Sequence, residues 1–330
     1  GGWYDGFLRG TVRCYEGIRT QAATKLARDQ QHLLIGPWMH EASPNPYAGQ
    51  EYFGIGASGD AIDLQGMMLA WFDQWLKGED NGVKNDPKVY YFLMGKNEWR
   101  ASDEWPPRDI EHTSFYLSSN GNANSAHGNG LLTLNQPDEN TPPDTYINHP
   151  SNPVPTVGGA HLDGIPGIFD TGVQSQGIVE SREDVLVYTS DTLNEDLTVA
   201  GNVILKMYAI TSATDTDWTA KLCDVRENAS SINICEGILR ASYRDSLEFP
   251  EPVESGKEYE YELDLGPTAI VFKKGHRIRL QISSTNFPAY SRNSGTNIGH
   301  NDTDELSDAV QKILHDATHP SQLILPILSQ

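Results

Sequence analysis

The chain has 330 residues, enough for one large domain or two ordinary ones, each with a buried core. Its 45 Asp and Glu residues outnumber its 24 Lys and Arg residues, and the formal net charge is −21. The acidic residues are scattered along the chain, so nucleic acid and anionic membranes are poor candidates as partners. No apolar run reaches the roughly 20 residues that a membrane helix needs.

Residues up to about Gly78 predict an α/β region. Apolar residues from Leu8 to Leu26 recur at helical spacing, and a short buried strand follows over His32 to Ile35. This strand is expected to run into a Gly-Pro turn and to present His40 just beyond its end. A second helix begins at Leu64 and carries a wide apolar face, which we interpret as core packing, with Gly78 placed to end it.

Beyond Gly78 the composition shifts toward Asn, Asp, Gly and Pro, which predicts a change of domain. We place the α/β piece at 1–84 and an all-β domain at 85–330, with 85–112 as a connector. Stretches 118–130 and 137–166 predict long surface loops. Residues 309–314 fit a helix and a strand equally well. A two-sheet sandwich or jelly roll suits the number of strands. The strands are expected at Val185–Tyr188, Val203–Ile210, Ile232–Leu239, Tyr259–Leu265, Ala269–Phe272, Ile278–Ile282 and Leu323–Ile327.

Asp5 and His40 are the residues of the α/β region best suited to acid–base chemistry. Each follows a glycine-containing segment, Gly1 to Tyr4 for the acid and Gly36 to Met39 for the base. In α/β-hydrolases the acid and the base of a Ser-His-Asp triad come last in the chain, from turns after the final strands. On spacing alone, two capping or hydrogen-bonded polar residues explain this pattern as well.

A triad also needs a serine on a Gly-x-Ser-x-Gly elbow, and the sequence contains none. The nearest segment, Gly56-Ala57-Ser58-Gly59-Asp60, fails at its fifth position and follows His40, which is the wrong order. It predicts a loop before the second helix.

Several ordered motifs give the chain a resemblance to a known family. It resembles the C-terminal part of serine α/β-hydrolases of the cocaine-esterase and X-Pro dipeptidyl-peptidase family, which includes α-amino-acid ester hydrolases. The motifs that carry the resemblance are Gly2-Trp3-Tyr4-Asp5, Gly36-Pro37-Trp38-Met39-His40, Trp71 to Gly78, Met94 to Arg100, Arg182 to Tyr188, Asp215 to Trp218, Glu236 to Arg240, Gly275 to Leu280 and His319-Pro320-Ser321.

The resemblance implies roles for particular residues. Asp5 would be the triad acid and His40 the general base, with Phe7 and Trp38 at the substrate. The loop at Gly158 and Gly159 would approach the site from a jelly-roll domain. The nucleophilic serine, an oxyanion-hole tyrosine and a helical cap would lie before Gly1. The family needs no metal and no organic cofactor.

We therefore expect the C-terminal part of a hydrolase that cleaves small esters, amides or peptides through an acyl-enzyme. The chain alone would be inactive, and its partner would be the missing N-terminal hydrolase part. A homo-oligomer is compatible with the sequence, and the compartment stays open. The alternative is a β-sandwich module that binds carbohydrate or protein. His276, before an alternating strand, is interpreted as structural, and Asp215 with Asp217 gives only a thin calcium signal.

Overall fold

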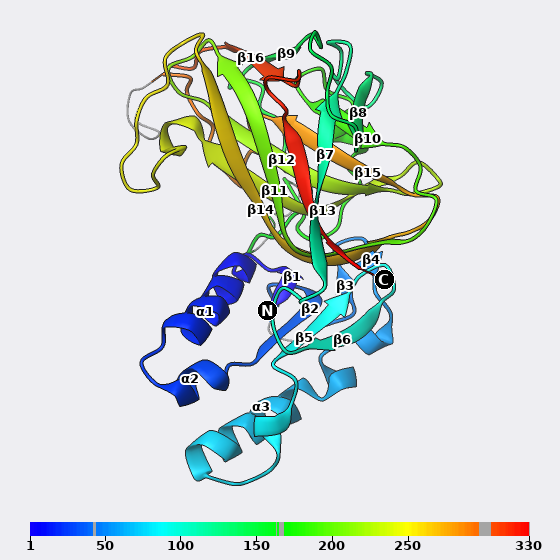
Figure 1. The fold of residues 1–330 in the computed structure, drawn as a ribbon, viewed down its shortest axis with the longest axis vertical. Coiled ribbons are helices and arrows are strands. Elements are labelled where there is room, and N and C mark those ends of the chain that lie inside the picture. The colour runs from blue at the N-terminus through cyan, green and yellow to red at the C-terminus, as the bar shows by residue number, and fades with distance from the viewer. Residues whose placement is uncertain (42–43, 163, 165–167, 297–304, 330) are drawn as a thin grey trace.

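The computed structural model describes residues 1–41, 44–162, 164, 168–296 and 305–329. Figure 1 shows two parts: a small one that combines helices with a short sheet, and a larger one built of long strands. None of the helices in these ranges is both long and apolar enough to cross a membrane.

A four-stranded sheet lies at the centre of the small part. Its order is β1 (Gly2–Tyr4), β2 (Leu33–Met39), β5 (Val89–Leu93) and β6 (Glu98–Ser102). The first three strands are parallel and β6 is antiparallel. β2 is apolar and largely buried, as is typical of a parallel strand covered on both faces. Strand pairing joins residues 89–102 to this sheet, and the domain boundary predicted at residue 84 stays a prediction.

β2 continues through Gly36 and Pro37, so the prediction of a turn at this point is wrong. Gly2 pairs with Gly36, whereas Tyr4 pairs with Met39, so the register shifts and the ladder is irregular here. Pro37 has no N–H to donate, and an irregular ladder position is one of the few places where a strand accepts proline. His40 still follows the end of the strand directly.

The predicted first helix is divided into α1 (Leu8–Gln21) and α2 (Lys25–Asp29). Thr24 separates them, because its side-chain oxygen accepts the backbone N–H of Ala27 and thereby caps α2. The buried face of α1 consists of Leu8, Val12 and Tyr15.

The second predicted helix is α3 (Leu64–Phe72), which continues as a wider π-type turn over Asp73–Lys77. Asp63 caps its start by accepting the backbone N–H of Gly66 at 3.2 Å. Gly78 ends it with a φ of 76°, so the prediction of a left-handed glycine cap is confirmed.

The apolar face of α3 is not buried, so our interpretation of it as core packing is wrong for this chain. No residue of α3 is buried, and the helix projects away from the large part (Figure 1). On this face Leu64, Trp71 and Trp75 are half-buried. The other large apolar side chains of α3 and the turn after it are exposed by 38–77%, and they are Met67, Met68, Leu69, Phe72 and Leu76.

The large part is a β-sandwich in which eleven strands pair among the described residues (Figure 1). Two further elements are a separate two-stranded hairpin of β3 (Tyr47–Ala48) and β4 (Glu51–Tyr52), and a short helix, α4 (Gly177–Glu180). The eleven strands are β7 (Ile110–Ser118), β8 (Gly130–Thr133), β9 (Asp144–Asn148), β10 (Leu186–Ser190), β11 (Leu197–Thr211), β12 (Asp217–Val225), β13 (Ser231–Arg240), β14 (Glu258–Phe272), β15 (Arg277–Ser283), β16 (Ala309–Leu314) and β17 (Gln322–Leu328).

Each predicted strand of this region overlaps an observed one, and the ambiguous segment 309–314 is strand β16. One expectation fails: the stretch 137–166 is not all loop, because β9 lies within it and pairs with β16. Residues 163, 165 and 166 of that stretch lie outside the described residues. The β-sandwich is confirmed, and its jelly-roll connectivity stays a prediction.

β14 shows how the sandwich core forms from an alternating pattern. Tyr261, Leu263 and Leu265 are each 1% exposed, whereas Glu260 and Glu262, which alternate with them, face solvent. The same strand joins the two parts, because the backbone of Met94, just after β5, exchanges hydrogen bonds with β14. The small sheet and the sandwich therefore share one continuous hydrophobic core.

Candidate active site

The parallel pairing of β1 and β2 brings Asp5 and His40 together. Both residues directly follow the C-terminal ends of neighbouring strands, and such ends meet at one edge of a sheet. The 34 residues between them include α1 and α2, which form the crossover that parallel strands require.

The two side chains are in contact. His40 Nδ1 lies 3.2 Å from Asp5 Oδ1 and 3.3 Å from Oδ2. The backbone N–H of Phe7 donates to Asp5 Oδ1 at 2.8 Å and helps to fix the carboxylate. Asp5 is 16% exposed and His40 is 44% exposed, so the acid is shielded while the imidazole faces open space. Because a carboxylate accepts hydrogen bonds, Nδ1 carries the proton and Nε2 is the basic nitrogen.

The structure places the two expected substrate residues differently. Phe7 is 55% exposed, and its ring meets the His40 ring edge-on at a centroid distance of 5.1 Å. Trp38 is buried, donates its indole N–H to the carbonyl of Ala57 at 2.6 Å and packs against Trp99. Phe7 therefore lies at the candidate site, while Trp38 supports the sheet from inside. A substrate role for either residue stays a prediction.

Within the described residues, no hydroxyl or thiol partner contacts Nε2 of His40. A hollow of about 530 Å³ lies beside Met39, the residue that precedes His40. It is lined from the small part by Met39, Gly49 and Gln50 and from the sandwich by Gly164, Asp170, Thr171 and Gln174.

A loop of the sandwich reaches Asp5. This loop follows the Gly158–Gly159 segment, which was expected to approach the site. Asp5 forms a parallel β-bridge with His161. The next residue, Gly6, lies so close to the loop that a Cβ there would come within 3.0 Å of the Leu162 nitrogen. The candidate site thus combines both parts of the molecule.

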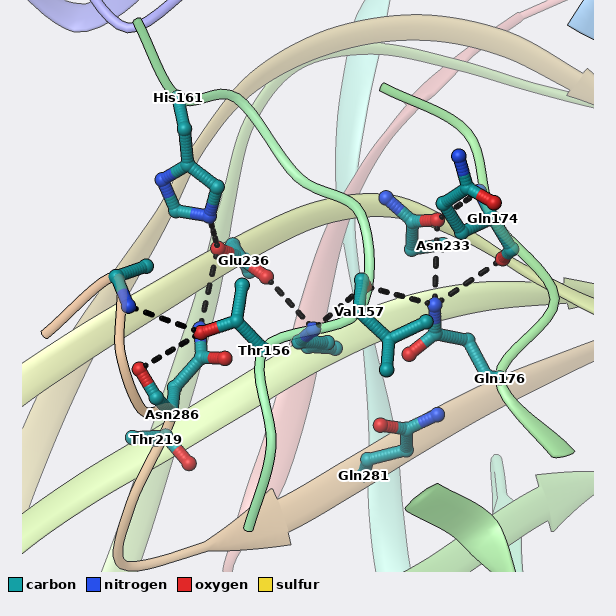
Figure 2. Close-up of polar contacts among 12 residues, drawn as sticks. Thr156, Val157, His161, Gln174, Gln176, Thr219, Asn233, Glu236, Gln281 and Asn286 are labelled. Carbon is teal, nitrogen blue, oxygen red and sulfur yellow. Dashed lines mark hydrogen bonds and ion pairs between the residues drawn. The ribbon is translucent and has the colours of Figure 1, made fainter. Parts of the chain in front are cut away.

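Polar side chains hold this loop on the sandwich, and sequence reasoning missed them (Figure 2). Glu236 on β13 is central: its Oε1 lies 3.0 Å from His161 Nε2, and its Oε2 lies 3.1 Å from the Lys221 ammonium. Asn286 donates to Oε1 at 3.3 Å. Burial raises the pKa of Glu236, but Lys221 and His161 more than offset it, and the pKa falls to about 2. The members lie far apart in sequence. Glu236 opens one of the motifs that carry the resemblance, but that motif does not indicate its partners.

A second cluster has the composition of a triad but lies in the core. Ser119 Oγ lies 3.2 Å from His315 Nε2, which is 2.8 Å from Asp144. The Ser119 hydroxyl donates to Asp144, not to the histidine, and Tyr188 donates to the same carboxylate. Asp144 and His315 are fully buried. The cluster therefore pairs polar core groups and offers no reactive hydroxyl to a substrate.

Other candidate residues from the sequence have internal partners. His276 Nδ1 lies 2.9 Å from Asp224, as its interpretation as structural implies. Asp217 pairs with Arg240 at 2.8 Å, and Asn293 donates to both Asp215 and Asp217. No group of three or more potential metal ligands occurs among the described residues.

Comparisons with known proteins address the class of protein. The X-Pro dipeptidyl-peptidase C-terminal non-catalytic domain matches residues 81–324. Cocaine esterase of Rhodococcus sp. (strain MB1 Bresler) is 37% identical over 333 residues, which cover 100% of this chain and 56% of that protein. The chain thus spans about half the length of this curated relative.

Two solved structures share the fold. An aminopeptidase from the marine sediment archaeon Thaumarchaeota archaeon superimposes with a TM-score of 0.84 at 24% identity, over 100% of this chain and 54% of that one. An α-amino acid ester hydrolase superimposes with a TM-score of 0.83 at 24% identity, over 99% and 54%. Together with the matched domain model, the fold places the chain in the class of C-terminal parts of the X-Pro dipeptidyl-peptidase type. The chain belongs to the cocaine-esterase and X-Pro dipeptidyl-peptidase family and corresponds to its C-terminal part.

Proposed function

We propose that the chain is the C-terminal part of a serine hydrolase that cleaves ester or amide bonds through an acyl-enzyme. Asp5 is the triad acid and His40 the general base. The contact between His40 Nδ1 and Asp5 at 3.2 Å carries this proposal, because a largely shielded acid and an accessible base are the arrangement a triad needs. The serine and the oxyanion hole belong to a preceding hydrolase part.

The geometry supports a definite division of roles. Asp5 holds the imidazole of His40 with its proton on Nδ1 and stabilises the imidazolium that forms during the reaction. Nε2 takes the proton of the serine hydroxyl as the serine attacks the substrate carbonyl. His40 then gives this proton to the leaving group, and later takes one from the water that releases the acyl group. Phe7 borders His40 and offers an apolar wall to the acyl group.

Exposed apolar surface supports the presence of a further hydrolase part. The face of α3 leaves Leu76 77% exposed and Leu69 60% exposed. A contiguous apolar surface of this kind is typical of a face that packs on another part of a protein. On this proposal the preceding part covers α3 and supplies the serine to His40.

The alternative function, a module that binds carbohydrate or protein, has no support from the relatives. Cocaine esterase is a hydrolase by name, and so are both solved structures that share the fold. No second function is proposed.

A hydrolysis assay with p-nitrophenyl acyl esters and amino-acid anilides tests the proposal. The protein that includes the preceding part is expected to hydrolyse at least one of these substrates, and the chain alone none. His40→Gln in the longer protein should reduce kcat by about 10⁴-fold or more, because the general base is lost. Full activity of this variant would contradict the proposal.

A further inference from the structure

β13 contacts both the loop that reaches Asp5 and the segment that carries Asp5. Through its side chain, Glu236 holds His161 of the loop at 3.0 Å. Through its main chain, the same residue accepts a hydrogen bond from the guanidinium of Arg9, which lies in the first turn of α1. Arg9 also pairs with Asp264 on β14 at 3.1 Å. The segment around Asp5 and the loop are therefore both held in place by the same strand, β13.

Asn233, three residues earlier on β13, repeats this double contact. Its carbonyl accepts the Tyr4 hydroxyl at 3.3 Å, just before Asp5. Its side-chain amide donates to the carbonyl of Gly172 at 3.0 Å and accepts the N–H of Gln174 at 2.7 Å, on the returning leg of the loop. Figure 2 shows Asn233 and Glu236 in the same network of polar contacts.

The loop meets Asp5 mainly through its backbone, and its side chains are anchored on the other side. His161 bridges Asp5 with its main chain while its imidazole points to Glu236 (Figure 2). The Lys221 ammonium, which neutralises Glu236, also donates to the carbonyl of Val157 at 3.1 Å. These groups are at most 12% exposed, so water competes little for them.

We propose that His161 and Glu236 form a latch that holds the loop against Asp5 and so keeps the carboxylate aligned with His40. His161 and Glu236 are positioning residues, since neither contacts the reacting atoms. The inference rests on the proposed function for its catalytic consequence only. The effect of the latch on how firmly Asp5 is held can be measured in the isolated chain.

His161→Phe opens the latch with little change in shape. A phenyl ring keeps the edge-on contacts that His161 makes with Phe169 and Tyr290, but it cannot form the ion pair with Glu236. Glu236 keeps Lys221 and Asn286, so its charge stays paired and the variant is expected to fold.

His276→Phe is the matched control. His276 also bonds to a buried carboxylate of the sandwich, Asp224 at 2.9 Å, and it has a similar exposure of 17% against 12% for His161. It lies outside the loop that reaches Asp5. A general effect of losing a buried histidine–carboxylate pair will therefore occur in both variants.

Amide hydrogen exchange in the isolated chain gives the first readout. The N–H groups of Phe7 and Leu8 donate to the side chain and the carbonyl of Asp5, respectively. His161→Phe should raise their exchange rates at least tenfold and leave the amides of β13 unchanged, and His276→Phe should leave all of them unchanged. Unchanged rates at Phe7 and Leu8 in His161→Phe, or equal increases in both variants, would overturn the latch.

Kinetics in the longer protein give the second readout. His161→Phe should lower kcat about tenfold or more with KM within twofold, because alignment of Asp5 matters mainly in the transition state. His276→Phe should stay within twofold in both constants. An unchanged kcat in His161→Phe would overturn the catalytic role of the latch. If the wild-type protein hydrolyses nothing, the proposed function fails, while the exchange result still decides whether the latch holds Asp5.

Discussion

Asp5 and His40 meet because each follows one of two neighbouring parallel strands. The acid is nearly enclosed, and its Oδ1 also accepts the Phe7 N–H, so only the imidazole has room to move. A pair built in this way suits a base that exchanges protons with groups supplied from outside. The behaviour of the pair therefore depends on how firmly the carboxylate is held.

Replacement of Asp5 by Asn tests that role in the longer protein. An amide has a donor where the carboxylate has only acceptors, so Nδ1 of His40 loses its fixed proton and the wrong tautomer forms. We expect kcat to fall by about 10³–10⁴-fold with little change in KM. Asp80→Asn, at a side chain 89% exposed, is the control and should be neutral. A loss below tenfold in Asp5→Asn would remove Asp5 from the triad.

Glu236 should make the free energy of unfolding depend on pH in the acid range. Its pKa is lowered from 4.5 to about 2, so the folded state favours the charged form, and this stability is present above pH 4.5. It should be lost as the pH falls from about 4.5 to 2, by an amount on the order of 3 kcal/mol. Urea unfolding of the isolated chain and of Glu236→Gln should show their difference in free energy shrinking across this window. A constant difference would contradict the shift.

Local sequence patterns predicted a secondary-structure element correctly where it depends on neighbouring residues or on a packing partner that any fold of this class supplies. The alternation in β14 predicted its buried face because any sandwich covers one side of a strand. The glycine cap at Gly78 depends on φ alone. The turn at Pro37 was predicted wrongly because a neighbouring strand, not the dipeptide, decides that the chain continues there. Burial of the α3 face failed for a similar reason, since packing depends on what lies against the helix.

The exposed face of α3 allows a test of its expected partner. Leu76→Glu should change the free energy of unfolding of the isolated chain by less than about 0.5 kcal/mol, because Leu76 is 77% exposed. In the longer protein the same change should cost about 2 kcal/mol or more, because a charge would be buried. Leu247→Glu, at an 80% exposed leucine of the sandwich, is the control and should be mild in both proteins. Equal small effects of Leu76→Glu in both would show that α3 stays uncovered.

At the scale of the whole molecule, the site belongs to both parts. The sequence analysis predicted Asp5 and His40 because short motifs mark them, and the resemblance pointed to the Gly158–Gly159 loop. It did not predict that Glu236, Lys221 and Asn286 anchor that loop, because these residues lie on separate elements and only the folded sandwich brings them together. Long-range polar networks of this kind leave no periodic signal in a sequence.

On the proposed function, Asp5 and His40 serve a serine outside this chain. Labelling with a fluorophosphonate, followed by mass spectrometry of the modified peptide, tests it most directly. The isolated chain should remain unlabelled, and the longer protein should be labelled at one serine before Gly1, with the label lost in His40→Gln. Stoichiometric labelling of any serine within residues 1–330, or labelling of the longer protein that does not depend on His40, would contradict the account.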